Sequence, residues 1–451
     1  MMRTLAAVLL VALLPLPLAA QPSSIRLTLA DAIARGFDTS HRLVEVRARE
    51  QGALAAVRGA HLADRPIVTA SAGYTRTNHV TEFAFGQGSA RTVVYPDIPD
   101  NVVSRVSFQW PIYTSGRVDA LERAATAEAQ AVGADIETTR ADLRLEIVRA
   151  YWAAATAREA VRVLEESTAR ADAQLRDARQ RFAVGLVPPN EVSSLEAQRS
   201  REQAQLIEAS NVRESTLVDL RRLIGADPET VVELADPLDA PAAPDAPDAP
   251  DAPDAPDAPA APALIQEALN QRPERKALNL RLGGVEARQQ AAMAANKPTV
   301  AVGAGVDYAN PNSRIFPRKD EWQESWDVSV NVSWAFFDFG RGKAQVAEVA
   351  AAATATRERI AEFDSVVAAD IRQRLLDLDS SLALVKAASD AVRSAAEARR
   401  VVGDRFAAGV ATSTDVVVAQ VAMLEAGLAR TRSLAGVRLA EARLHRSLGR
   451  P

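Results

Sequence analysis

The 451-residue sequence contains no cysteine, only four histidines, and few aromatic residues, which make up 5% of the chain. Without cysteine, the protein can have neither disulfides nor a lipid-bearing cysteine. The histidines, His41, His61, His79 and His445, do not fall at metal-ligand spacing, and the sequence lacks HExxH, GxSxG and complete phosphate-binding-loop motifs. We therefore predict no enzymatic activity, no cofactor and no metal.

Long apolar runs are missing after the first 20 residues, because no later stretch approaches 18 consecutive apolar residues. A transmembrane helix is therefore not expected in the mature chain. Residues 1–20 combine a basic start at Arg3, an apolar run from Leu5 to Leu14, and small residues at Ala19 and Ala20. This pattern predicts a secretory signal peptide, the alternative being a buried N-terminal helix. An exported chain of this kind must meet a membrane as strands, if it meets one.

A strong charge of either sign is also lacking once the acidic middle of the chain is set aside. The formal net charge is -5, but seven aspartates lie between Ala235 and Ala263 with no basic residue among them. Without those seven the net charge is +2, so it gives no reason to predict nucleic-acid binding. Asp-Ala-Pro occurs five times from Asp245 to Pro259, which predicts an extended linker over 235–262. An acidic docking tract is the alternative for this segment.

The sequence does contain a long internal repeat. The stretch Arg181–Val192 returns at Arg405–Val416, with Arg-Phe-Ala, a glycine and a valine in the same places. The chain runs without proline from Arg117 to Gly185, and again over the same length from Arg341 to Gly409. Each of these glycines is followed by another at one and the same spacing, at Gly225 and Gly449. The repeat predicts two helical hairpins, 117–225 and 341–449, whose long arms would each span roughly 100 Å.

Each recurring stretch is typical of one helix ending and another beginning. Gly185 and Gly409 suit the left-handed position just past a helix end. Asn190 and Thr414 are expected to cap the next helix, and the acids Glu191 and Asp415 favour its positive N-terminus.

Strand-like alternation precedes each helical hairpin, at about 66–113 and 298–338. Apolar residues alternate with polar ones with a period of two, for example in Val102–Trp110 and Val300–Tyr308. The apolar face has aromatic residues near the strand ends, and we predict a membrane belt made of Tyr74, Trp110, Tyr308, Trp326 and Trp334. A half-buried hairpin packed on helices is the alternative. The secretion signal, these aromatics and strand lengths of about 10 residues favour a membrane barrel.

Four strands cannot close a barrel, and lipid does not tolerate an open sheet edge. Several copies of the chain are therefore expected to share one barrel. The return arm of each hairpin is about half as long as the long arm, so the helices before the strands, 29–62 and 264–295, are expected to stack end to end with it. Two soluble coiled-coil hairpins would account for the helices but not for the strands.

The chain resembles the TolC-like outer membrane efflux proteins over essentially the whole mature sequence. The residues that carry the resemblance are Leu27–Ala32, Gln109–Tyr113 with Gly116 and Arg117, the echo Phe337–Arg341, and the two recurring stretches. The order, spacing and duplication of these motifs are more specific than any one of them.

The resemblance implies a fold that is mainly α with β: a tandem-repeat protomer with long helical coiled-coil hairpins that form an α-barrel in a homotrimer. Each of the three copies would contribute its four strands to one transmembrane barrel of about 12 strands. The implied function is an outer-membrane channel-tunnel of a Gram-negative cell with a long periplasmic extension. Its implied partners are a periplasmic adaptor protein, an inner-membrane transporter and outer membrane lipid. The domain division is 1–20 signal peptide, 21–234 first repeat, 235–262 linker and 263–451 second repeat.

The resemblance also assigns the two recurring stretches. Adaptor docking is expected at Val184, Gly185, Leu186, Gly409 and Val410, and a pore constriction is expected at Asn190, Glu191, Phe406, Thr414 and Asp415. Two family positions depart from the pattern, since a second acidic ring is replaced by Val418 and a basic latch residue by Ala411. Helix capping is an alternative role for Glu191 and Asp415. For the whole protein, a periplasmic adaptor or a soluble coiled-coil scaffold is the alternative, although tandem hairpins with alternating strand pairs argue against both.

Overall fold

A computed structural model describes residues 24–239 and 260–450, so the predicted signal peptide and residues 240–259 of the predicted linker lie outside the described residues. The chain divides into two compact units, and each takes segments from both sequence repeats. One unit holds residues 24–40, 142–239 and 373–446, and the other holds 41–141, 260–372 and 447–450. We call them the tip unit and the sheet unit. None of the helices in the described ranges is both long and apolar enough to cross a membrane.

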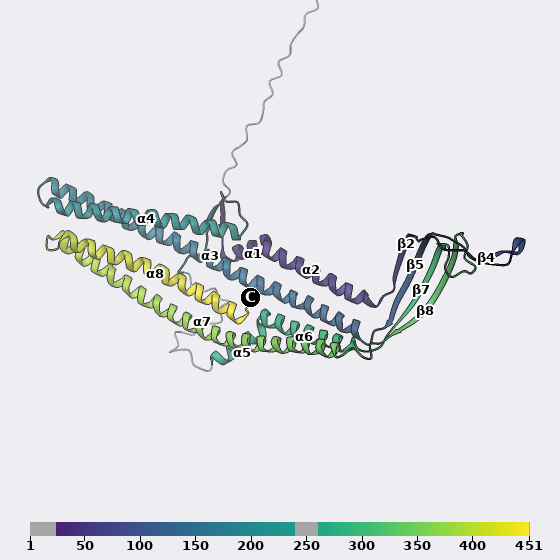
Figure 1. The fold of residues 1–451 in the computed structure, drawn as a ribbon. Helices are drawn as coiled ribbons and strands as arrows, with labels where there is room; N and C mark the ends of the chain where they lie inside the picture. The colour runs from purple at the N-terminus through teal and green to yellow at the C-terminus, as the bar shows by residue number, and fades with distance from the viewer. Residues whose placement is uncertain (1–23, 240–259, 451) are drawn as a thin grey trace, which may run out of the picture. The chain divides into compact units, whose positions relative to one another are not determined.

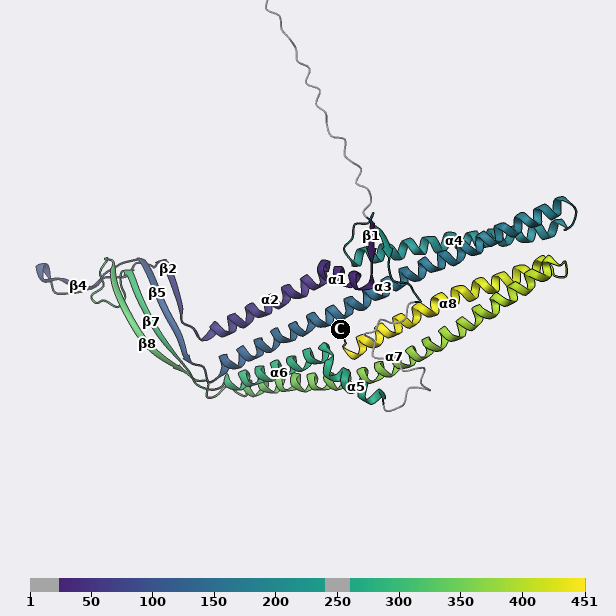
Figure 2. The same ribbon diagram turned by 180° about the vertical axis from the view of Figure 1, so that it is seen from behind.

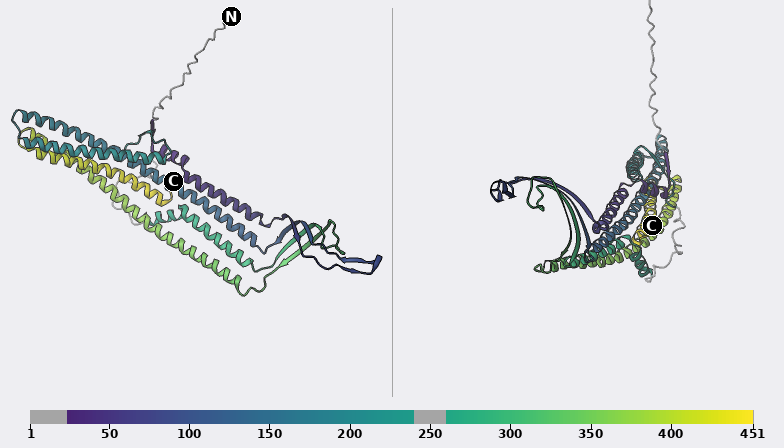
Figure 3. Two further views of the ribbon diagram at one scale, coloured as in Figure 1. Left: turned by 45° about the horizontal axis from the view of Figure 1, so that its top comes forward. Right: turned by 90° about the vertical axis from the view of Figure 1, so that its right-hand side faces the viewer.

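The sheet unit contains an antiparallel sheet of four strands in the order β2-β5-β7-β8 (Figure 1). The strands are β2 (Ile67–Arg76), β5 (Asp100–Tyr113), β7 (Thr299–Asn310) and β8 (Gln323–Ser333). β5 from the first repeat pairs with β7 from the second, which joins the two predicted hairpins into one curved sheet (Figure 3). The four predicted strands are confirmed.

The connection between β2 and β5 has structure of its own. It carries the short 3-10 helix η2 (Gly88–Ala90) and a small hairpin of β3 (Phe83–Phe85) and β4 (Thr92–Tyr95), neither of which was predicted.

Helices of the sheet unit lie side by side in the order α2, α3, α6, α7 (Figures 1 and 2). They are α2 (His41–His61), the first part of α3 (Arg117–Ala183), α6 (Pro273–Ala294) and the first part of α7 (Arg341–Ala407), with α5 (Ala260–Gln271) before α6 and the 3-10 helix η1 (Leu62–Asp64) after α2. Arg275 of α6 makes a two-pronged ion pair with Asp364 of α7, at 2.7 and 2.9 Å. Gly284 of α6 lies close to Ala127 of α3, where small side chains bring the helices together.

The tip unit contains α1 (Leu29–Thr39), α4 (Pro189–Leu223), α8 (Ser413–Leu448) and the remaining parts of α3 and α7. It also contains a parallel pair that the sequence analysis missed, β1 (Ser24–Leu27) with β6 (Val231–Leu234). The helical hairpins are as predicted: α3 and α7 each run for 67 residues, and α4 and α8 return for 35 and 36.

A buried tyrosine ties the strand pair of the tip unit to α3. Tyr151 is fully buried, and its hydroxyl lies 3.1 Å from the Leu27 carbonyl oxygen and 2.9 Å from an Asp236 carboxylate oxygen. The same carboxylate accepts a hydrogen bond from the backbone N–H of Leu29 at 2.7 Å. Burial raises the pKa of Tyr151 well above its usual range, so the hydroxyl keeps its proton.

Both return arms end in a glycine that lies against an earlier helix junction. Gly225, with φ +62°, follows α4 and touches the side chain of Thr39 at the end of α1. Gly449, with φ +76°, follows α8 and lies against the backbone of Gln271 and Arg272, between α5 and α6. Arg272 holds this second junction by donating to the Ser447 carbonyl oxygen at 2.5 Å and to Asp370 at 2.8 Å.

Candidate functional site

The apolar face of the sheet is open in the protomer. Val306, Val328 and Val330 are more than half exposed there, although valine is a residue that usually lies inside. The strand register places these valines on one face with the predicted belt residues, which are all exposed as well: Tyr74, Trp110, Tyr308, Trp326 and Trp334. A contiguous exposed apolar face of this kind marks a contact with lipid or with another protein.

The predicted belt residues fall into two groups at opposite ends of this face. Tyr74, Tyr308 and Trp326 lie toward the β7–β8 connection, and Trp110 and Trp334 lie toward the helices. Trp326 and Trp334 are eight residues apart in one extended segment, roughly 26 Å along it. The apolar band of outer-membrane barrels is about 25 Å tall and is bordered by aromatic girdles at both ends. The spacing agrees with the predicted belt, whose role in the membrane stays a prediction.

Polar groups of several belt residues have protein partners. The indole N–H groups of Trp110 and Trp334 donate to the carbonyl oxygens of Asp64 and Asn296, at 3.0 and 3.1 Å. The Tyr74 hydroxyl donates to Asp100 at 2.6 Å. Each ring thus combines an apolar body with a satisfied polar end, which suits a boundary between apolar and aqueous surroundings.

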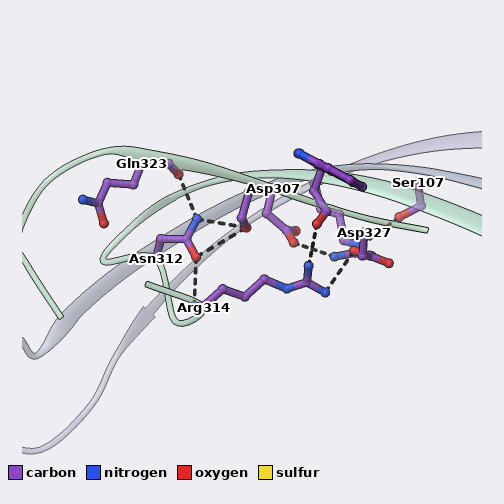
Figure 4. A network of polar contacts seen from close by, with 9 residues as sticks. Ser107, Asp307, Asn312, Arg314, Gln323 and Asp327 are labelled. Atoms are coloured by element: carbon purple, nitrogen blue, oxygen red, sulfur yellow. Dashed lines mark hydrogen bonds and ion pairs between the residues drawn. The ribbon is translucent and has the colours of Figure 1, made fainter. Parts of the chain in front are cut away.

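The opposite face of the sheet carries a cluster of ion pairs, which we call the Arg105 cluster and define as Arg105, Asp307, Arg314 and Asp327. Arg105 of β5 donates to Asp307 of β7 at 2.6 Å and to Asp327 of β8 at 2.9 Å. Arg314, from the β7–β8 connection, reaches Asp327 from the other side at 3.1 Å (Figure 4). The alternation of apolar and polar residues predicts a polar face here, but not that these four side chains meet.

Exposed aromatic residues at the end of the sheet were also missed. Phe336, Phe337 and Phe339 lie between β8 and α7, and Phe339 is 92% exposed with φ +55°. Ser115, the residue at the same place in the first repeat, has φ +54°. The run of aromatics from Trp334 to Phe339 was the available signal, of which only Trp334 was predicted to lie in the belt.

The two hairpin tips have the same backbone geometry. Gly185 and Gly409 have φ +75° and +73°, as predicted, and in each tip two backbone hydrogen bonds close the helix end. Leu186 N–H donates to the Arg181 carbonyl oxygen, and Val410 N–H donates to that of Arg405, both at 2.9 Å. The residues at which docking is predicted, Val184, Leu186 and Val410, are 64–74% exposed.

The predicted helix caps were wrong. Asn190 lies inside α4, because Pro189 already takes the first helical position, and the preceding Pro188 has no side chain that can cap. Thr414 lies inside α8, and Thr412 caps this helix by accepting from the backbone N–H of Asp415 at 3.2 Å. The hydroxyl and backbone N–H of Thr412 also donate to the Asp415 carboxylate, at 2.8 and 2.9 Å. The Thr412 backbone N–H, and to a smaller extent the Thr412 hydroxyl, lower the pKa of Asp415 below its usual value.

Of the predicted constriction residues, Phe406 makes the clearest contact between the hairpins. Its ring lies 5.3 Å from the guanidinium carbon of Arg181, which joins the end of α3 to the end of α7. Leu175, Ala178 and Leu195 form a small core, and Val417 of α8 packs against it. Glu191, Thr414 and Asp415 lie in the first turns of the return helices, and the last two are exposed.

Comparison with known proteins gives a family. The sequence profile of the family described as outer membrane efflux protein matches residues 37–226 and 264–450, which is most of the chain. Protein CyaE of Bordetella pertussis is 28% identical over 318 residues, 69% of this chain and 60% of that protein, so the chain spans less than two thirds of that relative. Outer membrane protein TolC of Vibrio cholerae is 22% identical over 394 residues, 86% of this chain and 83% of that protein.

Solved structures agree on the fold. The outer membrane protein VceC of Vibrio cholerae superposes with a TM-score of 0.74 at 19% identity, over 93% of this chain and 96% of that one. The MtrE outer membrane channel of Neisseria gonorrhoeae gives 0.73 at 17% identity, over 94% and 89%. At these identities the matches show the fold, which extends over nearly the whole chain. The chain therefore belongs to the outer membrane efflux protein family and is an outer-membrane efflux channel of the TolC type.

Proposed function

We propose that three copies of this chain close one barrel in the outer membrane and act as the exit duct of an export machine. The observation that supports this proposal is the sheet: within the described residues, β2 and β8 each have a strand neighbour on one side only, and one face carries exposed valines and aromatic residues. Unpaired backbone groups on such edges are too costly in lipid, so each β8 needs the β2 of another copy. Pairing around a ring satisfies every edge.

The hairpin tips are proposed to meet the rest of the machine. Val184, Leu186 and Val410 present exposed apolar side chains on a rigid, hydrogen-bonded turn, which is suitable for docking a periplasmic adaptor. The adaptor would in turn connect the duct to an inner-membrane transporter. Adaptor contacts that favour a splayed arrangement of the hairpins would open the duct. The second tip, with the acid Asp415 beside it, is proposed to line the constriction.

This function is tested by assembly and conductance together. The mature protein is expected to fractionate with the outer membrane, to run as a trimer that resists SDS until it is heated, and to conduct ions in planar bilayers. A β2 variant with Ala70→Pro and Ala72→Pro should lose the trimer, because proline cannot continue a strand ladder. Recovery of the unaltered protein as a soluble periplasmic monomer would contradict the proposal.

A further inference from the structure

The three charged residues that the strands contribute to the polar face of the sheet come together at one level. Register places Arg105 directly opposite Asp307, and Asp327 opposite Gly305 on the same face. None of the other β2, β5, β7 and β8 residues on this face is charged.

A glycine makes this arrangement possible. A Cβ atom at Gly305 would lie 2.4 Å from a terminal nitrogen of Arg105, closer than real contacts allow. The guanidinium therefore lies across β7 at Gly305, and reaches Asp327 on the strand beyond. A side chain at this position would block that path, so Gly305 positions Arg105.

Arg314 completes the charge balance of the cluster. Arg105 alone between two carboxylates would leave one negative charge per protomer, and Arg314 cancels it by pairing with Asp327. Its position is fixed by its own donation to the Trp326 carbonyl oxygen at 2.8 Å, and by a neighbouring turn in which Asn312, almost fully buried, accepts from the Arg314 backbone N–H (Figure 4).

We propose that the Arg105 cluster sets the ion selectivity of the barrel at the level of the β7–β8 connection, separately from the helical tips. This inference rests on the proposed function, because it takes the polar face to line the lumen of a closed barrel. The pairs are only partly buried, with 35% of the Arg105 side chain and 46% of the Arg314 side chain exposed, so passing ions would meet them. Charged side chains around a pore set ion selectivity, and balanced pairs keep it weak.

The test removes one sign of charge at a time and measures the reversal potential in a salt gradient across planar bilayers. Asp327→Asn leaves an excess positive charge in each protomer and should shift the reversal potential toward the chloride equilibrium potential. Arg314→Gln leaves an excess negative charge and should shift it toward the potassium equilibrium potential. Each shift should change the permeability ratio by at least about twofold at low salt, because a local potential of about one kT already changes ion concentrations by more than that.

A matched control is available on the same strand. Glu324 lies on β8 three residues before Asp327, on the opposite face, so Glu324→Gln removes the same charge outside the lumen and should leave the reversal potential unchanged. Arg314→Gln alters a connection and leaves the Arg105 pairs in place, so it tests the inference even if Asp327→Asn fails to assemble. The inference would be overturned, and the proposed function left intact, if both cluster variants conduct with an unchanged reversal potential. An equal shift of the reversal potential in Glu324→Gln would have the same meaning. An unaltered protein that does not conduct would instead contradict the proposed function and the inference together.

Discussion

At the residue scale, Asp415 can serve two roles at once. One carboxylate oxygen accepts both hydrogen bonds from Thr412, while the other makes no hydrogen bond to Thr412. Capping and pore lining, which the sequence left as alternatives, are therefore compatible. The donors lower its pKa, and a carboxyl whose pKa is lowered stays charged to more acidic pH than usual.

Asp415→Ala is expected to weaken block of the channel by a trivalent cation such as hexaamminecobalt, because three carboxylates would be lost from one ring. The concentration for half block should rise about tenfold. In the unaltered protein, block should persist as pH falls through the ordinary carboxyl range and disappear only below it.

Thr412→Ala separates the two roles of Asp415. It removes the hydroxyl donor but keeps the carboxylate, so block at neutral pH should remain, and the pH at which block disappears should move up toward the usual carboxyl range. Unchanged block in Asp415→Ala would remove Asp415 from the pore lining.

At the scale of the element, the same left-handed glycine ends helices in two different surroundings. Gly185 at the first tip has open space where a Cβ atom would lie. Gly225 at the end of α4 does not, because a Cβ there would lie 2.6 Å from the Cβ of Thr39. A left-handed backbone angle alone therefore does not determine how a glycine responds to substitution.

Gly185→Ala should cost only the strain of a left-handed alanine, about 1 kcal/mol. Gly225→Ala should cost roughly 1–3 kcal/mol more, because the packing against α1 must also shift. Melting followed by circular dichroism in detergent compares the two variants directly. Equal losses in melting temperature would show that the Thr39 contact relaxes without cost.

The elements were predictable where a pattern is long and unpredictable where it is short. Alternation over Val300–Tyr308 determines a strand and its apolar face, and glycine after a long proline-free segment determines a helix end. β1 is too short to show a period, and its partner β6 lies far along the chain, beyond the whole first helical hairpin. The caps were misplaced by two positions, because Pro188 and Thr412 precede the helices where Asn190 and Thr414 were expected to.

At the scale of the whole molecule, the repeat does not correspond to the units that fold together. Each unit combines parts of both repeats, and β5 pairs with β7 across the repeat boundary. The sequence indicated the duplication but not this exchange. The Arg105 cluster was hidden for the same reason, since Arg105 and its partners lie in different repeats and their meeting depends on the register of β5 with β7.

The Tyr151 contacts hold three distant segments of the tip unit together, at Leu27, Tyr151 and Asp236. Tyr151→Phe keeps the buried ring but removes the hydroxyl. The Leu27 carbonyl oxygen and the Asp236 backbone N–H then lose this partner. We expect a loss of about 1–3 kcal/mol in the free energy of unfolding, measured by urea denaturation. Tyr113→Phe, at an exposed ring, is the matched control and should be nearly neutral. Equal denaturation midpoints for the two variants would contradict a structural role for the Tyr151 hydroxyl.

The close approach of Arg105 to Gly305 also restricts the order in which this barrel wall can evolve. While position 105 carries arginine, a side chain at 305 has to displace the guanidinium from its path to Asp327. Once a shorter residue replaces Arg105, a side chain at position 305 no longer meets it. Asp307 and Asp327 then lose a positive partner, and they can be replaced in turn. Sequences that descend from this one should therefore vary at position 305 only after they have varied at position 105. A residue larger than glycine at 305 would then indicate that Arg105 had already been replaced.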